Sequence, residues 1–327
     1  MLHKQTFYIQ RNKTLNNILS LINNQVFLYK EKSMKKIIMA TLLMGLVSVA
    51  SAQVTLSGKV SAVVDTSEVG TNKSTTQLVT EPTSNFAISV NEKLGGGLTA
   101  RAVVETSLSG NTFGGSETRL GDRQSTVGIA NKFGSVDLGR NVHSHFLAIT
   151  SNDVFGTLYG SVAGDVHNLR NLRLGDAVFV SVNPVKGASL AYERTLNGPG
   201  ADATVVAING TFKGVNGSVA RFEQGVEKST VVGLTTKLAG TTITYVHSDD
   251  EGLVNSKGDS VGVAHRFGDI TAKASYGRTN QDVTAHAIGA DYHFSKRTSL
   301  NVAYRNVDAA GTARDTKGFG VGITHLF

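Results

Sequence analysis

The 327-residue chain contains no cysteine, no tryptophan and only three prolines. The absence of cysteine excludes disulfide scaffolds, thiolate nucleophiles and metal sites built on cysteine ligands. Charged residues make up 17% of the chain, too few for a disordered protein, and no apolar run is long enough to cross a bilayer as a helix. Glycine is abundant, with 36 residues, but it follows no three-residue period, which excludes a collagen-like chain.

The first 52 residues differ in charge from the rest. The formal net charge is +7, yet this stretch holds seven of the 32 Lys/Arg and one of the 25 Asp/Glu, which leaves about +1 for the remainder. A basic start at Met34, an apolar stretch over 37–49 and Ala50-Ser51-Ala52 follow the order of a secretory signal peptide. We expect residues 1–33 to be an upstream extension or a long n-region, 34–52 a signal peptide cleaved after Ala52, and 53–327 the mature domain.

From Gln53 onward, apolar residues alternate with small or polar ones over segments of about ten residues. About sixteen such segments are separated by very short and longer connections, mostly in alternation. Tilted strands that cross a bilayer need about 9–11 residues, whereas globular strands average about 5–6. Since lipid cannot satisfy a free sheet edge, the sheet must close. The sequence therefore predicts an all-β fold: a transmembrane antiparallel β-barrel of about sixteen strands, with tight turns at one end and longer loops at the other.

Several polar segments are expected to be solvated and to have no specific function. Thr66–Thr83 and Asp249–Gly258 are predicted to be loops, and the acidic run from Asp249 to Glu251 a solvated face. His143 and His145 have metal-like spacing, but no third ligand lies near in sequence, so a solvated pair is expected. No hydrolase motif is present. We expect no metal, no cofactor and no enzymatic activity.

Several motifs after residue 52 match one protein family in their order and spacing. They are Gln53–Gly58, Glu92–Ala100, Arg123–Ile129, Phe133–Asn141, Arg173–Pro184 and the terminal Phe327. These stretches resemble the general porins of Gram-negative outer membranes, most closely the β-proteobacterial group. The resemblance implies an exported, outer-membrane general diffusion porin: a passive, water-filled channel for small hydrophilic solutes and ions. A surface-interaction barrel or adhesin, and an outer-membrane barrel enzyme, remain as alternatives.

The resemblance also implies partners. The protein is expected to form a homotrimer, to contact outer-membrane lipid and lipopolysaccharide, and to be folded by the barrel-assembly machinery, for which Phe327 resembles the signal. No nucleic-acid partner is expected, because the basic excess lies in the segment that is expected to be removed.

The longest connection, His143–Arg173, is expected to fold inward as the third outer loop and to constrict the pore, as in the family. Its candidate carboxylates are Asp153 and Asp165, and Phe155 and Tyr159, with Val154 and Leu158, are expected to pack it against the wall. The family places a basic cluster opposite such carboxylates, and charges across a narrow aqueous gap create a transverse field. The basic candidates on the wall are Arg101, Arg123, Arg140, Arg173, Lys273, Arg266 and Arg305.

Alternation supports a position inside the lumen for Arg101. It does not support one for Arg140, which shares its parity with Val136 and Leu138. Either Gly139 permits a β-bulge that turns Arg140 inward, or the resemblance misleads at this position.

Overall fold

The alternating segments form strands in the computed structural model, which describes residues 52–108, 119–170, 172–198, 202–252, 255–309 and 315–327. The predicted upstream extension, and all of the predicted signal peptide except Ala52, lie outside the described residues. The strands are β1 Gln53–Val69, β2 Thr75–Thr80, β3 Asn85–Gly95, β4 Leu98–Ser107, β5 Gln124–Asn131, β6 Gly134–Val142, β7 Arg173–Val185, β8 Ala188–Thr195, β9 Ala203–Phe212, β10 Val215–Gln224, β11 Glu227–Leu238, β12 Thr241–Glu251, β13 Ser256–Phe267, β14 Ile270–Thr279, β15 Thr284–His293, β16 Thr298–Asp308 and β17 Thr316–Leu326.

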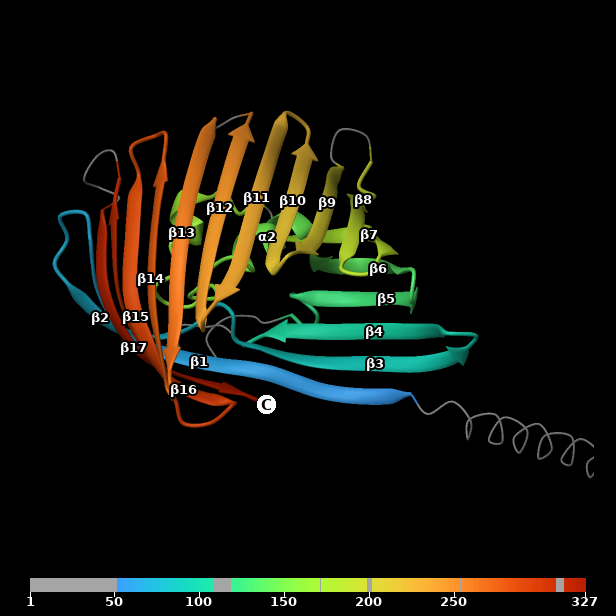
Figure 1. The fold of residues 1–327 in the computed structure, drawn as a ribbon, viewed down its shortest axis with the longest axis horizontal. Coiled ribbons are helices and arrows are strands. Elements are labelled where there is room, and N and C mark those ends of the chain that lie inside the picture. Colours follow the sequence, from blue (N-terminus) through green and yellow to red (C-terminus); the bar gives the residue numbers. More distant parts are fainter. Residues whose placement is uncertain (1–51, 109–118, 171, 199–201, 253–254, 310–314) are drawn as a thin grey trace, which may run out of the picture. The chain divides into compact units, whose positions relative to one another are not determined.

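The sheet closes on itself. From β3 to β17 each strand pairs antiparallel with the next (Figure 1), and β17 returns to β1, from Lys59 opposite Leu326 to Val69 opposite Thr316. On its other edge β1 pairs with β3 along its first half and with β2 along its second half. β2 and β3 therefore share one position, so the 17 strands form a closed antiparallel barrel of sixteen positions. This confirms the predicted fold.

Two of the predicted loops are largely strand. Thr66–Thr83 contains the end of β1 and the whole of β2, and Asp249–Gly258 contains the end of β12 and the start of β13. The alternation rule missed β2 because its sequence, TTQLVT, has almost no apolar period. The wall is interrupted only briefly between β2 and β3, where the Ser61 N–H donates to Ser84 Oγ (3.0 Å).

Tight turns join the strands at one end of the barrel. Two of them, Lys213–Gly214 and Ala239–Gly240, are two-residue connections in which both residues have positive φ. This is the type I′ geometry, whose twist matches that of an antiparallel hairpin. The short connections thus fix the strand register on this side.

One face of the sheet, the outer face, is apolar and exposed. Its aliphatic band includes Val219, Ile243, Val261, Ile288 and Val321. Phenylalanines flank the tight turns and are highly exposed: Phe133 (64%), Phe212 (73%), Phe267 (61%) and Phe294 (61%). Farther from the turns lie Tyr192, Tyr245, Tyr276 and Tyr304. The tyrosines lie within the aliphatic band, Tyr245 opposite Val261 and Tyr304 opposite Ile288. An apolar band that carries tyrosines and has phenylalanines at one edge fits a bilayer-spanning surface.

The opposite parity forms the inner face, which is built from small side chains on many strands. The buried alanines of this face are Ala207, Ala220, Ala285, Ala287 and Ala303. Two short helices, α2 (Ser144–Thr150) and α3 (Ala163–Val166), lie in the connection between β6 and β7. Among the described residues, no helix is long and apolar enough to cross a membrane.

The last residue of the chain takes part in closing the barrel. The Phe327 N–H donates to the Gly58 carbonyl and the Gly58 N–H donates to the Phe327 carbonyl, both at 3.1 Å. The Phe327 ring lies over Gly58, where any side chain on β1 would collide with it. The terminal phenylalanine is therefore part of the seam between the first and last strands.

Candidate functional site

The connection from His143 to Leu172, here called the long loop, packs against the inner face. Its helix α2 lies beside β9, β10 and β11 (Figure 1), where Ile149 joins a cluster of buried wall residues: Ala207, Ala220, Val231 and Val246. Farther along, Phe155 and Val166 pack on inner-face alanines of β15 and β16. Phe155 is only 4% exposed. Ile149, Phe155 and Val166 thus pack against the wall, whereas Leu147 of the same loop is exposed.

Glycines on the inner face make room for the largest loop side chains. A Cβ built on Gly320 of β17 would lie 2.6 Å from Tyr159 Cδ1, and one on Gly289 of β15 would lie 3.0 Å from Phe155 Cε1. Both distances are too short for an undisturbed contact. The alternation of glycine in the last strand is visible in the sequence, but its function as a bed for Tyr159 is not.

Two histidines bond the long loop to serines of the wall. His145 Nε2 lies 2.7 Å from Ser229 Oγ, and the ring nitrogens of His167 lie 2.8 Å from Ser248 Oγ and 2.8 Å from Ser260 Oγ. His145 is 0% exposed and His167 is 2% exposed. His143 is also fully buried, so the expectation of a solvated histidine pair is wrong. The described residues contain no cluster of three candidate metal ligands.

Ion pairs and capping bonds fix both ends of the long loop. At its end, the Arg170 guanidinium binds the carboxylates of Glu227 and Asp250. At its start, the Glu193 carboxylate accepts the backbone N–H of Ser144 (3.0 Å) and its hydroxyl (2.5 Å). Asp250 is 2% exposed. The expectation that the acidic run is a solvated face is therefore wrong for this residue, because Arg170 lies too far away in sequence to be foreseen.

The tip of the long loop reaches β1. Tyr159 Oη donates to Asp65 Oδ1 (2.6 Å), and the Tyr159 backbone N–H donates to Glu81 Oε1 (2.8 Å). Burial, followed by the hydrogen bond to Asp65, raises the pKa of the Tyr159 hydroxyl, so it stays protonated and donates. The long loop therefore spans the inner face from β8 to β1.

The two candidate loop carboxylates have different partners. Asp153 accepts the backbone N–H groups of Phe155 and Thr157, both at 2.9 Å, and so stabilises a turn. Asp165 binds Arg305 Nη2 through both oxygens at 2.6 Å. Arg305 lies on β16, beneath the long loop. The loop–wall ion pair thus joins the loop to the wall on which it lies.

Arg101 lies on the inner face of β4, as alternation predicts. Its Nε lies 2.5 Å from Asp137 Oδ1 on β6, and its Nη2 donates to Ser135 Oγ (2.9 Å). Gly128 of β5 lies between the two strands, in register with both Arg101 and Asp137, and leaves space for this pair. The missing side chain at Gly128 allows an ion pair to form across an intervening strand.

Three other predicted arginines gather at the loop end of β4 to β7. Arg123 Nε lies 2.5 Å from Glu105 Oε1. The β6–β7 register shifts at Gly139, but Arg140 keeps its register with Ser125 of β5 and donates from Nε to the Asp122 carbonyl (2.7 Å). Arg173 begins β7, and its buried Nε has no hydrogen-bond partner among the described residues.

The remaining two basic candidates lie apart from this group. Lys273 of β14 pairs with Asp291 (2.5 Å) and lies 5.6 Å from the centre of the Phe155 ring, so it is covered by the long loop. Arg266 lies beside a tight turn, where its Nε donates to the Gly268 carbonyl (2.8 Å). The structure therefore divides the predicted basic residues among the covered wall, the uncovered wall and one turn.

Comparison with known proteins identifies the family. A family model described as "Gram-negative porin" matches residues 40–327. The chain belongs to the Gram-negative porin family. It is similar to the "Major outer membrane protein P.IB" of Neisseria lactamica, with 28% identity over 90% of this chain and 100% of the relative. The corresponding protein of Neisseria meningitidis serogroup B is 27% identical, with the same coverage.

Solved structures share the fold of this porin. The "Anion-selective porin from Comamonas acidovorans" superimposes with a TM-score of 0.75 at 20% identity, covering 85% of this chain and 100% of that one. An OmpF structure from Salmonella typhi, in complex with daunomycin, gives a TM-score of 0.66 at 18% identity, covering 84% and 98%. The family and these likenesses place the porin in the outer membrane as a closed β-barrel.

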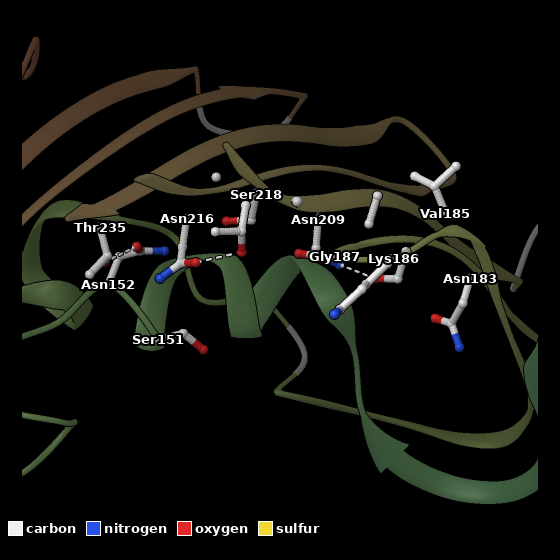
Figure 2. A pocket seen from close by; sticks show the side chains of 15 residues that line it. Ser151, Asn152, Asn183, Val185, Lys186, Gly187, Asn209, Asn216, Ser218 and Thr235 are labelled. Carbon is white, nitrogen blue, oxygen red and sulfur yellow. Dashed lines mark hydrogen bonds between the residues drawn. The ribbon is translucent and has the colours of Figure 1, made fainter. Parts of the chain in front are cut away.

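The inner face of the porin also contains a polar hollow near the tight turns. It has a volume of about 640 Å³ and lies between the end of α2 and β7 to β11. Figure 2 shows amide and hydroxyl side chains around it, among them Asn152, Asn209, Asn216 and Ser218, with Lys186 as the one labelled charged residue. Thr235 Oγ1 donates to Asn152 Oδ1 (2.5 Å) and so fixes the end of α2 there. The side chains that line this hollow are mostly amides and hydroxyls, with one lysine.

Proposed function

We propose that this porin is a general diffusion channel in which the long loop folds into the barrel and narrows the water path. Small hydrophilic solutes and ions would cross the outer membrane through the remaining opening. The closed sheet, the apolar outer face and the polar groups of the inner face support this function, because a barrel of sixteen strands leaves an aqueous interior.

One observation carries the proposal: the route of the long loop. Its contacts run over the inner face from Glu193 on β8 to Asp65 on β1. The hydrogen bonds and ion pairs of its described residues 144–170 do not reach β3, β4, β5 or β6, whose inner face is called here the bare wall. The proposed opening therefore lies between the long loop and the bare wall.

The bare wall and the neighbouring loop end supply the charges of this opening. Arg101 with Asp137, and Arg123 with Glu105, form ion pairs there, and Arg173 lies nearby, whereas Arg140 keeps the outer-face parity of Leu138. Ordered charges along a narrow aqueous gap favour polar solutes, which exchange water for the field, over apolar ones. Of the two loop carboxylates, Asp165 is bound to Arg305 and Asp153 stabilises a turn. The long loop therefore contributes less free negative charge to the opening than the family resemblance implies.

Other properties are proposed from the family alone. We expect the porin to form a homotrimer, to act without enzymatic activity, to contact lipopolysaccharide, and to be inserted by the barrel-assembly machinery through Phe327. Chemical cross-linking of detergent-extracted protein tests the trimer, and a Phe327→Ala variant with reduced membrane insertion would support the assembly signal.

Conductance across planar bilayers tests the channel directly. Refolded protein should produce stepwise, ohmic current increments, and liposomes that contain it should swell in small sugars but not in large ones. Protein that inserts with full β-sheet circular dichroism but passes no current would contradict the proposed function and would favour an adhesin or another barrel without a pore.

A further inference from the structure

We propose that His145 and His167 are positioning residues which hold the long loop on the inner face only while their rings are uncharged, so that acid releases the loop and closes the channel. This inference rests on the proposed function, in which the long loop narrows the water path. Its basis is the placement of both rings between the loop and the wall, away from water.

The surroundings of His145 offer no hydrogen-bond acceptor for a second ring proton. Its Nε2 is bonded to Ser229 Oγ (2.7 Å), whereas its Nδ1 is buried and has no hydrogen-bond partner among the described residues. The Phe222 ring lies 5.9 Å from the imidazole, centre to centre. Protonation of Nδ1 would therefore create a buried donor without an acceptor, together with a buried charge.

His167 is different, because both of its ring nitrogens have partners. The serine hydroxyls of β12 and β13 can each donate or accept, so they suit the neutral ring, which has one donor and one acceptor. After protonation both hydroxyls could still accept. The cost at His167 is therefore the charge itself, in a site where the residue is 2% exposed.

The charged groups around the two rings do not stabilise an imidazolium. Near His145 lie His143, the Arg170 guanidinium and His167, and all three oppose a further positive charge. The carboxylates closest to Arg170, those of Glu227 and Asp250, are already bound to it. The Glu193 carboxylate is bound to Ser144 at the start of α2.

Around His167, two titratable groups of the outer face have opposite effects. Asp259 favours the imidazolium and His247 opposes it, and the Asp259 carboxylate accepts hydrogen bonds from Tyr245 (2.7 Å) and from His247 Nδ1 (2.9 Å). Its attraction for a charge on His167 is thus shared with closer partners, and burial remains the dominant influence.

The direction of the pH effect follows from the burial. Burial, with His143 and Arg170 as further causes, lowers the pKa of His145 from 6.5 to about 3. Burial lowers the pKa of His167 from 6.5 to about 4. In a released loop both rings would return towards 6.5, so docking is strongest above pH 6.5 and weakens as the pH falls towards 4. Each histidine lowers the docking equilibrium constant up to tenfold per pH unit in this window.

A released long loop stays attached to β6 and β7 at its two ends, so it would move into the water path. We therefore expect wild-type channels in planar bilayers to lose at least tenfold in open probability between about pH 6.5 and about pH 4.5. A His145→Gln/His167→Gln variant, which cannot become charged, should lose this response relative to its own current at neutral pH. The matched control is His286→Gln, an exposed histidine of the outer face, which should titrate like the wild type.

A disulfide tether tests the mechanism without altering either histidine. A Cβ built on Gly262 would lie 2.9 and 3.0 Å from the two methyl carbons of Val154 in the long loop, so a Val154→Cys/Gly262→Cys pair suits a disulfide. The same Cβ would lie 2.6 Å from Thr244 Oγ1, so the pair is made together with Thr244→Ala, and Thr244→Ala alone serves as its background. The chain has no other cysteine. The oxidised variant should stay open in acid, and reduction should restore the closure.

The outcomes separate this inference from the proposed function. Absence of current at neutral pH in the wild type would overturn the channel itself. Current at neutral pH, with an acid response that is the same in the wild type, the double histidine variant and the oxidised tether, would overturn the inference alone. If the histidine variant fails to fold, as judged by circular dichroism, the tether still decides.

Discussion

The inner face of the porin has two regions of contrasting chemistry. Where the long loop lies, on β9 to β17, the wall presents mainly alanine, glycine and serine, and bonds such as His145–Ser229 and Asp165–Arg305 join the loop to it. On the bare wall, charged side chains pair with one another, as Arg101 does with Asp137. Small residues thus mark where a segment is docked, whereas paired wall charges occur in both regions, since Lys273 pairs with Asp291 beneath the loop.

The largest loss of stability should come from breaking the ion pairs of Arg170 with Glu227 and Asp250 at the end of the long loop, here called the clamp. The Arg170 side chain is 8% exposed, so Arg170→Met would leave the Glu227 and Asp250 carboxylates poorly solvated and unpaired. We expect the free energy of unfolding to fall by about 3 kcal/mol. Since the chain has no tryptophan, urea titration in lipid vesicles would be followed by circular dichroism.

The control for this variant is Arg194→Met, whose side chain pairs with Asp202 but is 48% exposed. It should leave the unfolding midpoint unchanged, because exposed ion pairs contribute little. Equal losses of unfolding free energy in the two variants would contradict the view that the buried ion pairs of Arg170 stabilise the protein more than an exposed ion pair does.

A smaller effect is expected when the bed of the loop is filled. Gly320→Leu would displace the Tyr159 ring, and such overpacking costs about 1–3 kcal/mol. Gly210→Leu, on the outer-face parity of β9, is the control for a glycine with free space around it, because a Cβ there would have no neighbour closer than 3.7 Å. Equal urea midpoints for the two leucine variants would contradict the claim that Gly320 makes room for the Tyr159 ring.

The smallest of these effects concerns the hydrogen bond at the loop tip. Tyr159→Phe removes the donor to Asp65, but Asp65 Oδ2 still accepts from Ser67 Oγ (2.9 Å). The expected loss is about 1 kcal/mol. Tyr304→Phe, on the outer face, should cost less, and the reverse order would contradict the role of the tip contact.

The barrel itself could be predicted from the sequence because its signals are local. Two-residue alternation, tight turns and the length of the segments are each readable within a dozen residues, and they sufficed for the strand number and the closure. β2 escaped because Thr75–Thr80 alternate hardly at all in polarity. The packing of Phe155 could also be foreseen, since an exposed loop has little use for such a side chain.

The partners of the long loop could not be predicted in the same way. His145 meets Ser229, and Arg170 meets Asp250, at sequence separations of 84 and 80 residues. In the sequence, the histidines look like a solvated pair and Asp250 like part of an acidic surface. Their burial depends on where the loop docks, and docking depends on the shape of a wall assembled from many strands.

The reversal potential in a salt gradient tests most directly whether the water path runs along the bare wall. Arg101→Gln would leave the Asp137 charge unbalanced beside the proposed opening, whereas Lys273→Gln would leave Asp291 unbalanced beneath Phe155 and the long loop. We predict a clear shift towards cation preference for Arg101→Gln and a much smaller one for Lys273→Gln. An equal shift in both variants, or a larger one for Lys273→Gln, would contradict this division of the porin.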